Sequence, residues 1–595
     1  MPNSTRTRLD SLSLSYSWSE AGEKCRLSKR VLIDQQMIPI TTNLHNALTL
    51  IRRHKEISNT LWWIDMLSID QSDAGEEKAE QLQLMPQIFP EAISISYWLG
   101  QGDESTKTAF DFLRQWSDLE TEQLTNRDET KERLITELIA EINDPLNRPN
   151  LEALHTLLSK RWFTRIWTFV EACHPTTYVA DFLCGEVLID QIELVQAISS
   201  LLDTTLPFST TDVFAEHETT VMSLVMHTAW PYKKRNFATF YFASIHRQVS
   251  EPRDLLYALR SMMPNADRYP VFDKSNAQWT DIAVAMQYTR AVLDDDQNLN
   301  ILSLIAAEND FVSHTAAYPS WSIKLYERKK NDARDQVWLW WPWQVPSWML
   351  TKRQPMYYLP AGNIEGPILQ LQGIRIGYVA HYVAASQLHS RLGVNTDYQC
   401  PSWQRLIRSC RLFADEQTLH GIYNPTGEQS MVALMRTLCF NRLNITPGPQ
   451  LASRLEGLLR QYRTIFKTQG KLDPGAEMVS DLLLARVARG LSGHTESSND
   501  RYGELEDWVM NRYAELYMSL AGGSYAFFKT VEGAIGRCSS SARSGDLVVM
   551  LAGSSIPYVL RETATAHWQL IGCAYVHGHM KEVGEEDKLE AFDLV

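Results

Sequence analysis

The pattern of apolar and polar positions predicts a βαβ unit between residues 61 and 100. Leu61 to Ile69 is almost wholly apolar, which is typical of a strand covered on both faces of a parallel sheet. Alternate side chains of a strand point to the same face, so Asp65 would lie on the apolar face that carries Trp63. A charge is unfavourable there unless it has a partner. Asp70 follows where this strand ends, and open α/β sheets bind ligands at that edge. The pattern therefore locates a candidate site without identifying its chemistry.

Periodicity also predicts the other elements of the first 200 residues. The expected elements are a strand over 11–18, a hairpin over 30–40, a helix from Thr42 (its cap) to Arg53, helices over 105–119 and 129–142, and a strand pair over 176–189. Strands that alternate with helices favour a layered α/β architecture. We therefore expect residues 1–200 to form an α/β domain with a largely parallel sheet.

The rest of the chain changes its pattern twice. Residues 201–400 are mixed and mostly helical by pattern, and residues 401–523 are helical. Period-2 patterning then begins at residue 524, in short segments separated by turn-rich joints, and it predicts an antiparallel β meander with a tail over 524–595. The expected fold is thus an α/β domain followed by a mostly α-helical region and a C-terminal meander.

Composition and charge narrow the possible partners and location. The 595 residues are 44% hydrophobic and 22% charged, with a formal net charge of −14. This charge disfavours binding to nucleic acid or to anionic membranes. The most apolar window, 337–350, contains prolines and is shorter than the roughly 20 residues of a membrane span. With no signal-like N-terminus and with eight scattered cysteines, we expect reduced thiols and a cytoplasmic location.

Motifs for bound cofactors are absent from the sequence. It contains no P-loop, GxGxxG, HExxH or GxSxG pattern, and no CxxC pair. We therefore expect neither a cofactor nor a metal ion, and we regard nucleotide-driven motor work, Rossmann redox chemistry and serine hydrolysis as poor matches.

Several sequence blocks resemble the fungal heterokaryon incompatibility (HET) family. LWWIDMLSIDQSD is similar to the family's L-W-I-D-A-I-C-I-N-Q-D-D, and it is followed by a match to V-x-V-W-L-G. Upstream and downstream blocks match in order, namely Leu14–Trp18, Asn43–Leu48, Arg161–Trp167 with Glu171, Pro252–Asp254, Tyr318–Trp321, Gly545–Asp546 and Tyr575–Gly578. The resemblance spans most of the chain, and it implies a distantly TIR-like α/β domain. It further implies cell death through cleavage of NAD by a glutamate, which Glu171 matches.

Four signature positions depart from the family pattern. The family's Gly, Cys, Asn and Gln are replaced by Ser19, Ser68, Asp70 and Val170, whereas the apolar scaffold is intact. Either a changed site or ordinary sequence drift explains these departures.

Asp65, Asp70, Glu171 and Arg165 form the candidate catalytic group. A carboxyl group in an apolar strand resists ionisation, so its pKa rises and it can transfer protons near neutral pH. Arg165 can pair with either acid. The alternative is a structural ion pair that joins the Arg161–Glu171 segment to the sheet.

Tryptophan side chains form the candidate substrate pocket. We assign Trp18, Trp63, Trp340 and Trp341 to it, because the tryptophan-rich segment around residue 340 offers rigid apolar walls. Ordinary core or interdomain packing is the alternative for such a cluster.

Two functions remain open at this stage. The first is a HET-like scaffold that has become a cofactor-free cyclase or pericyclase of Diels–Alder type, acting on an apolar terpenoid or polyketide precursor. The second is the family role in non-self recognition, with a protein partner or self-association and possible NAD cleavage. The altered signature and the tryptophan-rich segment favour the first.

Overall fold

The computed structural model describes most of the two ends of the chain and parts of its middle. The described residues are 11–19, 25–53, 60–70, 88–89, 91–123, 148–173, 180–205, 236–244, 247–270, 279–309, 318–326, 366–384, 422–429, 433, 437, 525–581, 583–584 and 586–595. The chain divides into two compact units, 1–271 with 325–332, and 272–324 with 333–595. The four domain limits expected from the sequence stay a prediction.

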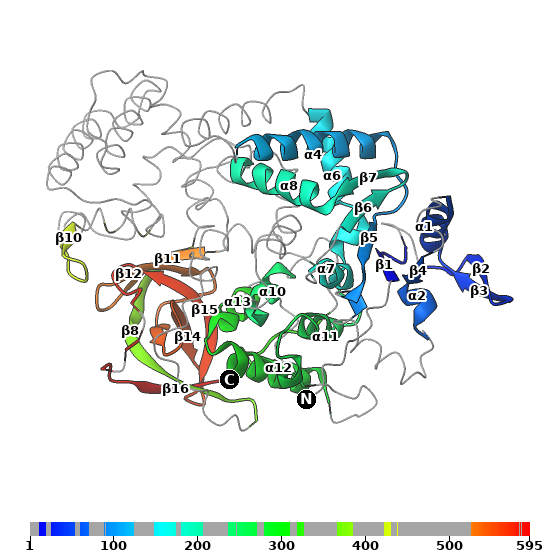
Figure 1. Ribbon diagram of the computed structural model, residues 1–595. Helices are drawn as coiled ribbons and strands as arrows, with labels where there is room; N and C mark the ends of the chain where they lie inside the picture. Colours follow the sequence, from blue (N-terminus) through cyan, green and yellow to red (C-terminus); the bar gives the residue numbers. More distant parts are fainter. Residues whose placement is uncertain are drawn as a thin grey trace, which may run out of the picture. The chain divides into compact units, whose positions relative to one another are not determined.

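The first unit is built on a five-stranded sheet with the order β4-β1-β5-β6-β7 (Figure 1). Its strands are β1 (Ser11–Tyr16), β4 (Leu61–Trp63), β5 (Ser94–Trp98), β6 (Ala180–Cys184) and β7 (Val187–Asp190). The first four are parallel to their neighbours, and β7 alone is antiparallel, to β6. This arrangement confirms an N-terminal α/β region with a largely parallel sheet.

The strand order reverses at β1. The chain places β4 on one side of β1 and then β5 on the other, so β1 lies between them. In open α/β sheets, ligands bind outside the carboxyl ends of the strands at such a reversal. The residues that follow β1, β4 and β5 therefore occupy the position where a site is expected.

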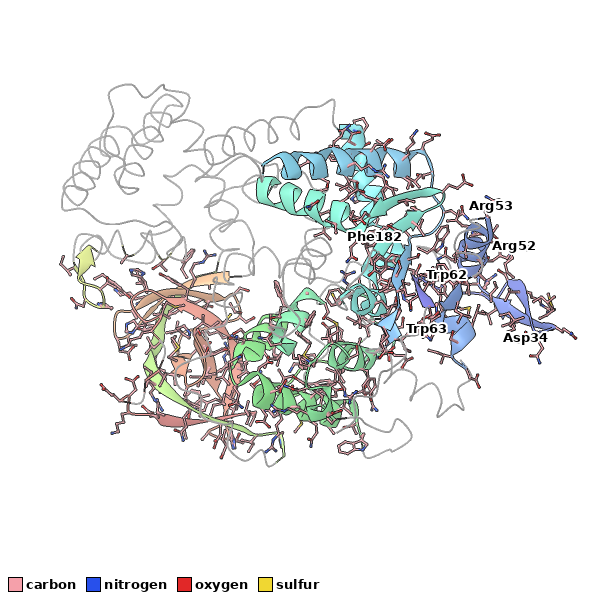
Figure 2. The ribbon with its side chains drawn as sticks, in the orientation of Figure 1. Asp34, Arg52, Arg53, Trp62, Trp63 and Phe182 are labelled. Carbon is pink, nitrogen blue, oxygen red and sulfur yellow. The ribbon has the colours of Figure 1, made fainter. Side chains whose placement is uncertain are left out.

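Helices surround this sheet. They are α1 (Thr42–Arg53), α4 (Glu104–Gln123), α6 (Arg148–Leu158), α7 (Ile166–Cys173), α8 (Gln191–Thr205), α10 (Phe237–Ala243) and α11 (Asp254–Arg260), with short 3₁₀ turns at Arg161–Thr164 and Ala266–Arg268. α4 packs on both α6 and α8, and α11 packs on α7. Figure 2 shows Phe182 of β6 inside this unit, where its ring stacks on the Phe163 ring and packs at a tilt against the Tyr97 ring.

The long strand expected over Leu61–Ile69 is wrong. β4 ends at Trp63, and a one-turn helix, α2 (Asp65–Ser68), follows it. The Asp65 carboxylate accepts a hydrogen bond from the Met66 amide at 2.6 Å, and the Ser68 hydroxyl accepts one from the Ile64 amide at 3.2 Å. Short polar side chains that bond nearby amides favour helix starts over strands. Asp65 therefore lies at the head of a helical turn.

Several other predicted elements are confirmed. The hairpin is formed by β2 (Lys29–Ile33) and β3 (Gln36–Ile40), and helix α1 follows with Leu44, Ala47 and Ile51 buried. Its cap is Thr41 and not Thr42, because the Thr41 hydroxyl accepts the Leu44 amide at 3.2 Å. The predicted helix over 129–142 and the helix of the βαβ unit lie outside the described residues.

The second unit contains a closed antiparallel barrel. Its strands are β8 (Leu369–Ala384), β11 (Tyr525–Thr530), β12 (Ile535–Ser539), β13 (Leu547–Leu551), β14 (Pro557–Glu562), β15 (Trp568–Val576) and β16 (Glu590–Leu594). The predicted meander is confirmed for β13, β14 and β15. The sequence did not reveal β8, which pairs with β13, β11 and β16 and thereby closes the ring.

Smaller elements accompany the barrel. They are α12 (Asp281–Asp296), α13 (Asn300–Asn309), β9 (Ile422–Tyr423) and β10 (Glu428–Gln429). α13 packs on β15. Among the helices that the structure describes, none is long and apolar enough to span a membrane.

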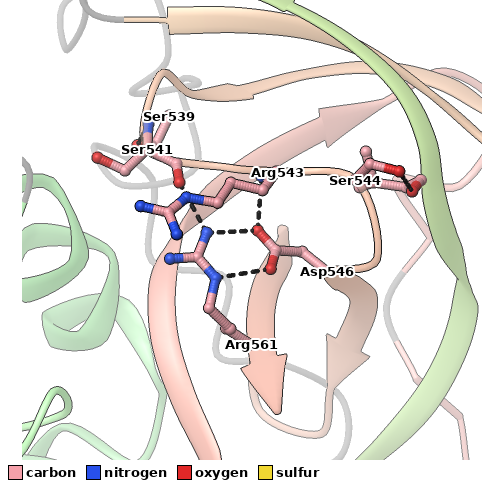
Figure 3. Close-up of polar contacts among 7 residues, drawn as sticks. Ser539, Ser541, Arg543, Ser544, Asp546 and Arg561 are labelled. Carbon is pink, nitrogen blue, oxygen red and sulfur yellow. Dashed lines mark hydrogen bonds and ion pairs between the residues drawn. The ribbon is translucent and has the colours of Figure 1, made fainter. Parts of the chain in front are cut away.

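A buried ion pair fixes the turn between β12 and β13 (Figure 3). Arg561 donates to both oxygens of the Asp546 carboxylate at 2.8 Å, and the Arg543 amide donates to one of them at 2.7 Å. Asp546 is only 3% exposed. A bidentate pair of this kind is strong and directional, so it holds the turn in one conformation.

Candidate acid centre at the end of the parallel strands

Alternation along β1 divides its side chains between two environments. Leu14 and Tyr16 belong to the apolar cluster that includes α1, whereas the serines at positions 11, 13 and 15 point to the opposite face. The hydroxyl of Ser15 is thereby directed to the side on which Glu171 lies. A strand that reads as alternating serine and apolar residues thus supplies a polar group to a buried site.

Glu171 of α7 lies at the centre of this site. It is only 7% exposed, and its Oε2 accepts a hydrogen bond from the Ser15 hydroxyl at 2.5 Å. The Ser15 oxygen in turn accepts the Trp162 indole N–H at 2.9 Å. Burial raises the pKa of Glu171 to about 8, a rise that Asp65 increases and that Ser15 and Arg165 oppose. Glu171 is therefore mostly protonated near neutral pH, although it can still lose its proton.

Asp65 is the second acid of the site. Its Oδ2 accepts the Trp18 indole N–H at 2.7 Å. Burial raises the pKa of Asp65, while the hydrogen bond from Trp18 and the charge of Arg165 lower it. The charge of Asp65 raises the pKa of Glu171, and the charge of Arg165 lowers the pKa of both acids, so the three groups interact electrostatically.

Tyr16 completes the polar group. Burial and the Asp65 charge raise its pKa well above the usual value, so its hydroxyl stays protonated. The hydroxyl approaches Asp65 closely enough to lower the pKa of that acid. Among the described residues no acceptor meets hydrogen-bond geometry with the Tyr16 oxygen. A proton donor is therefore available beside Asp65.

The start of the segment that carries Arg165 and Glu171 is held by three contacts. Arg165 donates to the Tyr16 carbonyl at 3.5 Å and forms an isolated parallel bridge with Gln248. Trp167 donates its indole N–H to Asp254 at 3.0 Å. These contacts explain why blocks far apart in the sequence belong to one scaffold, since each fixes the start of α7 against β1 or α11.

A second set of bonds ties the end of β1 to α1. Asn43 donates to the Ser17 carbonyl at 2.6 Å, and its oxygen accepts the Trp98 indole N–H at 2.8 Å. The carboxyl ends of β1 and β5 are therefore joined through one buried amide. Buried amides whose bonds are satisfied in this way hold their surroundings in a unique geometry.

Three of the four predicted catalytic residues meet in the structure. Asp65, Glu171 and Arg165 interact electrostatically. Asp70 is exposed beyond α2, so the prediction that it joins the acids has no support from its position. The assignment of catalytic roles stays a prediction.

The predicted tryptophan pocket is not assembled among the described residues. Trp18 lies at the acid centre, bonded to Asp65. Trp63 packs edge-on against Phe89 with ring centroids 5.4 Å apart, as part of the unit's apolar core. Trp340 and Trp341 lie outside the described residues.

Sequence reasoning did not assign Ser15, Tyr16 or Trp162 to the site. Each lies in a block that carries the family resemblance, LSYSW or RWFTRIW. Their polar atoms in otherwise apolar runs are the signal that marks them, because a polar group in a buried strand or turn needs a partner.

Two of the altered signature positions make contacts of their own. The Ser19 hydroxyl accepts a hydrogen bond from Arg161 at 2.6 Å, a bond for which glycine has no side chain. The hydroxyl of Ser68, the last residue of α2, accepts a hydrogen bond from the Ile64 amide. Val170 is fully buried in α7. These substitutions are accommodated by the scaffold, and none of the three removes a member of the acid centre.

The arrangement supports proton transfer and stabilisation of positive charge. A neutral acid that can ionise near pH 8 lies beside a second carboxyl group, a guanidinium and a tyrosine hydroxyl. Such groups serve as general acids, bases or electrostatic stabilisers. Within the described residues, no cluster of acidic, histidine or cysteine side chains is suited to hold a metal ion.

Comparison with known proteins gives two family matches. The model described as "Heterokaryon incompatibility protein (HET)" matches residues 12–171, and the model described as "Het-6 beta-barrel domain" matches residues 489–595. The first match begins in β1 and ends at Glu171, so it encloses the acid centre. The second contains β11 to β16, in agreement with the closed barrel.

A curated relative matches nearly the whole chain. The chain is 21% identical, over 653 aligned positions, to "Heterokaryon incompatibility protein 6, OR allele" of Neurospora crassa. The alignment covers 98% of this chain and 91% of that protein. No solved structure matches significantly, and the expected likeness to TIR domains is not shown.

Proposed function

Because the chain is a divergent member of the fungal heterokaryon incompatibility (HET) family, we propose that it acts in non-self recognition and triggers cell death. The observation that carries this proposal is the coincidence of the family match with the acid centre. The match ends at Glu171, and the centre joins residues from the beginning and the end of the matched region. The apolar scaffold and the acids persist despite the changed signature positions.

Induced expression of the full chain in a filamentous fungus tests this proposal. We expect growth arrest and uptake of a vital dye after induction, compared with cells that carry the empty vector. Growth at the rate of the vector control, with the protein demonstrably soluble and abundant, would contradict it.

We further infer that the acid centre is the catalytic site of this activity, with NAD as its substrate. Hydrolysis would break the bond between the nicotinamide nitrogen and the ribose C1′, while water supplies the oxygen that C1′ receives and releases a proton. The departing nicotinamide leaves positive charge on the ribose, which a carboxylate stabilises, so Glu171 acts in this step in the form that has lost its proton. The coupled acids Glu171 and Asp65 support this assignment.

Purified protein incubated with NAD tests the chemistry separately from cell death. We expect release of nicotinamide by the wild-type chain and by the Glu186→Gln variant, which changes an exposed acid (side chain 77% exposed). Glu171→Gln should release none. If all three proteins are inactive although the wild type kills cells, the substrate assignment is wrong and the incompatibility proposal stands.

The cyclisation hypothesis has no comparable support. The comparisons point to incompatibility proteins and not to biosynthetic enzymes, and two of its pocket residues, Trp340 and Trp341, lie outside the described residues. We therefore do not propose it for this protein.

A further inference from the structure

The hairpin β2–β3 has apolar side chains on both of its faces. The cross-strand pair Val31 and Ile38 lies on the inner face, where Val31 packs against the apolar cluster of β1 and α1. The pair Leu32 and Met37 lies on the outer face, and these side chains are 64% and 56% exposed. Solvent-facing hairpin positions are usually polar, so the outer face has the character of an interface.

The outer face extends over the length of the hairpin. Arg30 and Pro39 form the next cross-strand pair on that face, and both are exposed. Leu27, which precedes β2, is 56% exposed. We call the surface made by Leu27, Arg30, Leu32, Met37 and Pro39 the hairpin face. Figure 2 shows the hairpin projecting away from the sheet with Asp34 at its tip, so the hairpin face is accessible to another molecule.

The turn at the tip carries an acidic side chain. Asp34 and Gln35 have φ values of 45° and 64°, the left-handed region that two-residue hairpin turns require and that glycine adopts at least cost. Asp34 is exposed at this turn. The tip of the hairpin therefore carries a solvent-exposed negative charge.

Charge is distributed unevenly along the hairpin. Arg26, Lys29 and Arg30 are exposed at its base, and Asp34 is exposed at its tip. A surface that is basic at one end, apolar in the middle and acidic at the other end is complementary to itself when two copies lie antiparallel. Two-fold contacts between identical subunits have this property, because each patch meets its own copy in the reverse direction.

We propose that the hairpin face binds the hairpin face of a second copy of this chain, with the two hairpins antiparallel. Leu32 and Met37 of the two copies pack together at the centre, and Asp34 of each copy pairs with Arg30 of the other. A different, uniformly acidic protein would complement the base of the hairpin but would be repelled by Asp34, so charge favours a second copy. The contact is small, so the association is weak, with a Kd on the order of micromolar.

Sedimentation velocity of the purified full chain from about 1 to about 100 µM tests this proposal. We expect a concentration-dependent monomer–dimer equilibrium for the wild type. Leu32→Ser combined with Met37→Ser should raise the Kd at least roughly tenfold, because central apolar contacts dominate small interfaces. Val531→Ser, which changes an apolar residue that is 71% exposed in another unit, is the matched control and should leave the Kd unchanged.

A charge exchange tests the antiparallel geometry. Arg30→Glu alone and Asp34→Arg alone should each weaken the dimer, because each places like charges opposite one another. The double variant should restore the dimer, because the ends again complement each other with their signs reversed. Only an antiparallel pair of hairpins predicts this recovery.

Several results would overturn the proposal. The first is that the wild-type chain stays monomeric up to about 100 µM. The second is that the combined Leu32 and Met37 substitutions leave the dimer intact. The third is that the double charge variant dimerises no more strongly than either single variant. Binding only to a different protein would also overturn it. The measurement uses purified protein and does not depend on cell death or NAD cleavage, so its outcome is separate from that of the proposed function.

Discussion

The Ser15 hydroxyl donates a hydrogen bond of 2.5 Å to the Glu171 carboxyl group, although the two residues are 156 positions apart in the sequence. This bond joins the end of β1 to α7. It also links Glu171 to the Trp162 indole, which donates to the Ser15 oxygen. The position of the central acid is therefore set by the first strand of the domain.

Ser15→Ala should destabilise the first unit by about 2 kcal/mol, because it leaves both the Trp162 N–H and the Glu171 carboxyl group without this partner in a buried site. Ser13→Ala is the matched control. Ser13 lies on the same face of β1 and is fully buried, and its hydroxyl has no hydrogen-bond partner among the described residues. Its removal should be neutral or stabilising. Urea denaturation of both variants measures the difference, and equal effects would show that the bond is not important.

The pH dependence of stability should change in Glu171→Gln. In the unfolded chain Glu171 ionises near its ordinary pKa of 4.5, whereas the folded protein holds its pKa near 8. The folded state binds more protons between these values, so this residue's contribution is complete below about pH 4.5 and is lost as pH rises to about 8. The limiting slope for one group is about 1.4 kcal/mol per pH unit.

The comparison of wild type with Glu171→Gln isolates this residue from the other titrating groups. The free energy of unfolding of the variant relative to wild type should increase steadily from about pH 5 to about pH 8, because glutamine does not ionise. A difference that stays constant over this range would mean that Glu171 is already ionised in the folded protein.

Arg561→Ala should destabilise the barrel unit by about 3 kcal/mol, because it leaves the buried Asp546 carboxylate without its bidentate partner. Arg290→Ala is the control, since Arg290 pairs with Asp294 at 3.9 Å on an exposed helix surface. Its loss should cost less than about 0.5 kcal/mol. Thermal unfolding distinguishes the two variants, and similar losses would contradict the structural role of the Asp546 pair.

Local sequence patterns predicted many elements correctly. Alternation with a period of 2 or 3.6 residues predicted the hairpin of β2 and β3, the apolar face of α1 and the three strands β13 to β15. The exception at Asp65 has a local cause. Seven apolar residues in the run suggested a longer strand, but one carboxylate that bonds the Met66 amide is enough to start a helical turn.

Closure of the barrel could not be predicted in this way. β8 contains glycines at positions 373 and 377, which weaken strand patterning, and it pairs with β11 and β13, which are more than 140 residues later in the chain. The alternating runs LQLQ and IRI within β8 are a local strand signal, but they do not reveal which distant strands β8 pairs with.

The site was only partly predictable for a similar reason. Asp65 was singled out as a charge in an apolar run and Glu171 as the acid that matches the family pattern, and the structure brings them together with Arg165. Asp70 follows the end of the apolar run, and it is exposed. Whether Ser15, Tyr16 and Trp162 belong to the site depends on which helix lies beside the end of which strand. Only the fold supplies that information.

The viability of fungal cells that express either the wild-type chain or Glu171→Gln tests the central claim most directly. Both proteins should be induced to equal levels, together with Glu186→Gln as the exposed acidic control. The account predicts that the wild type and Glu186→Gln kill the cells, whereas Glu171→Gln is folded and harmless. Killing by Glu171→Gln at the wild-type level would contradict the assignment of the acid centre as the source of cell death.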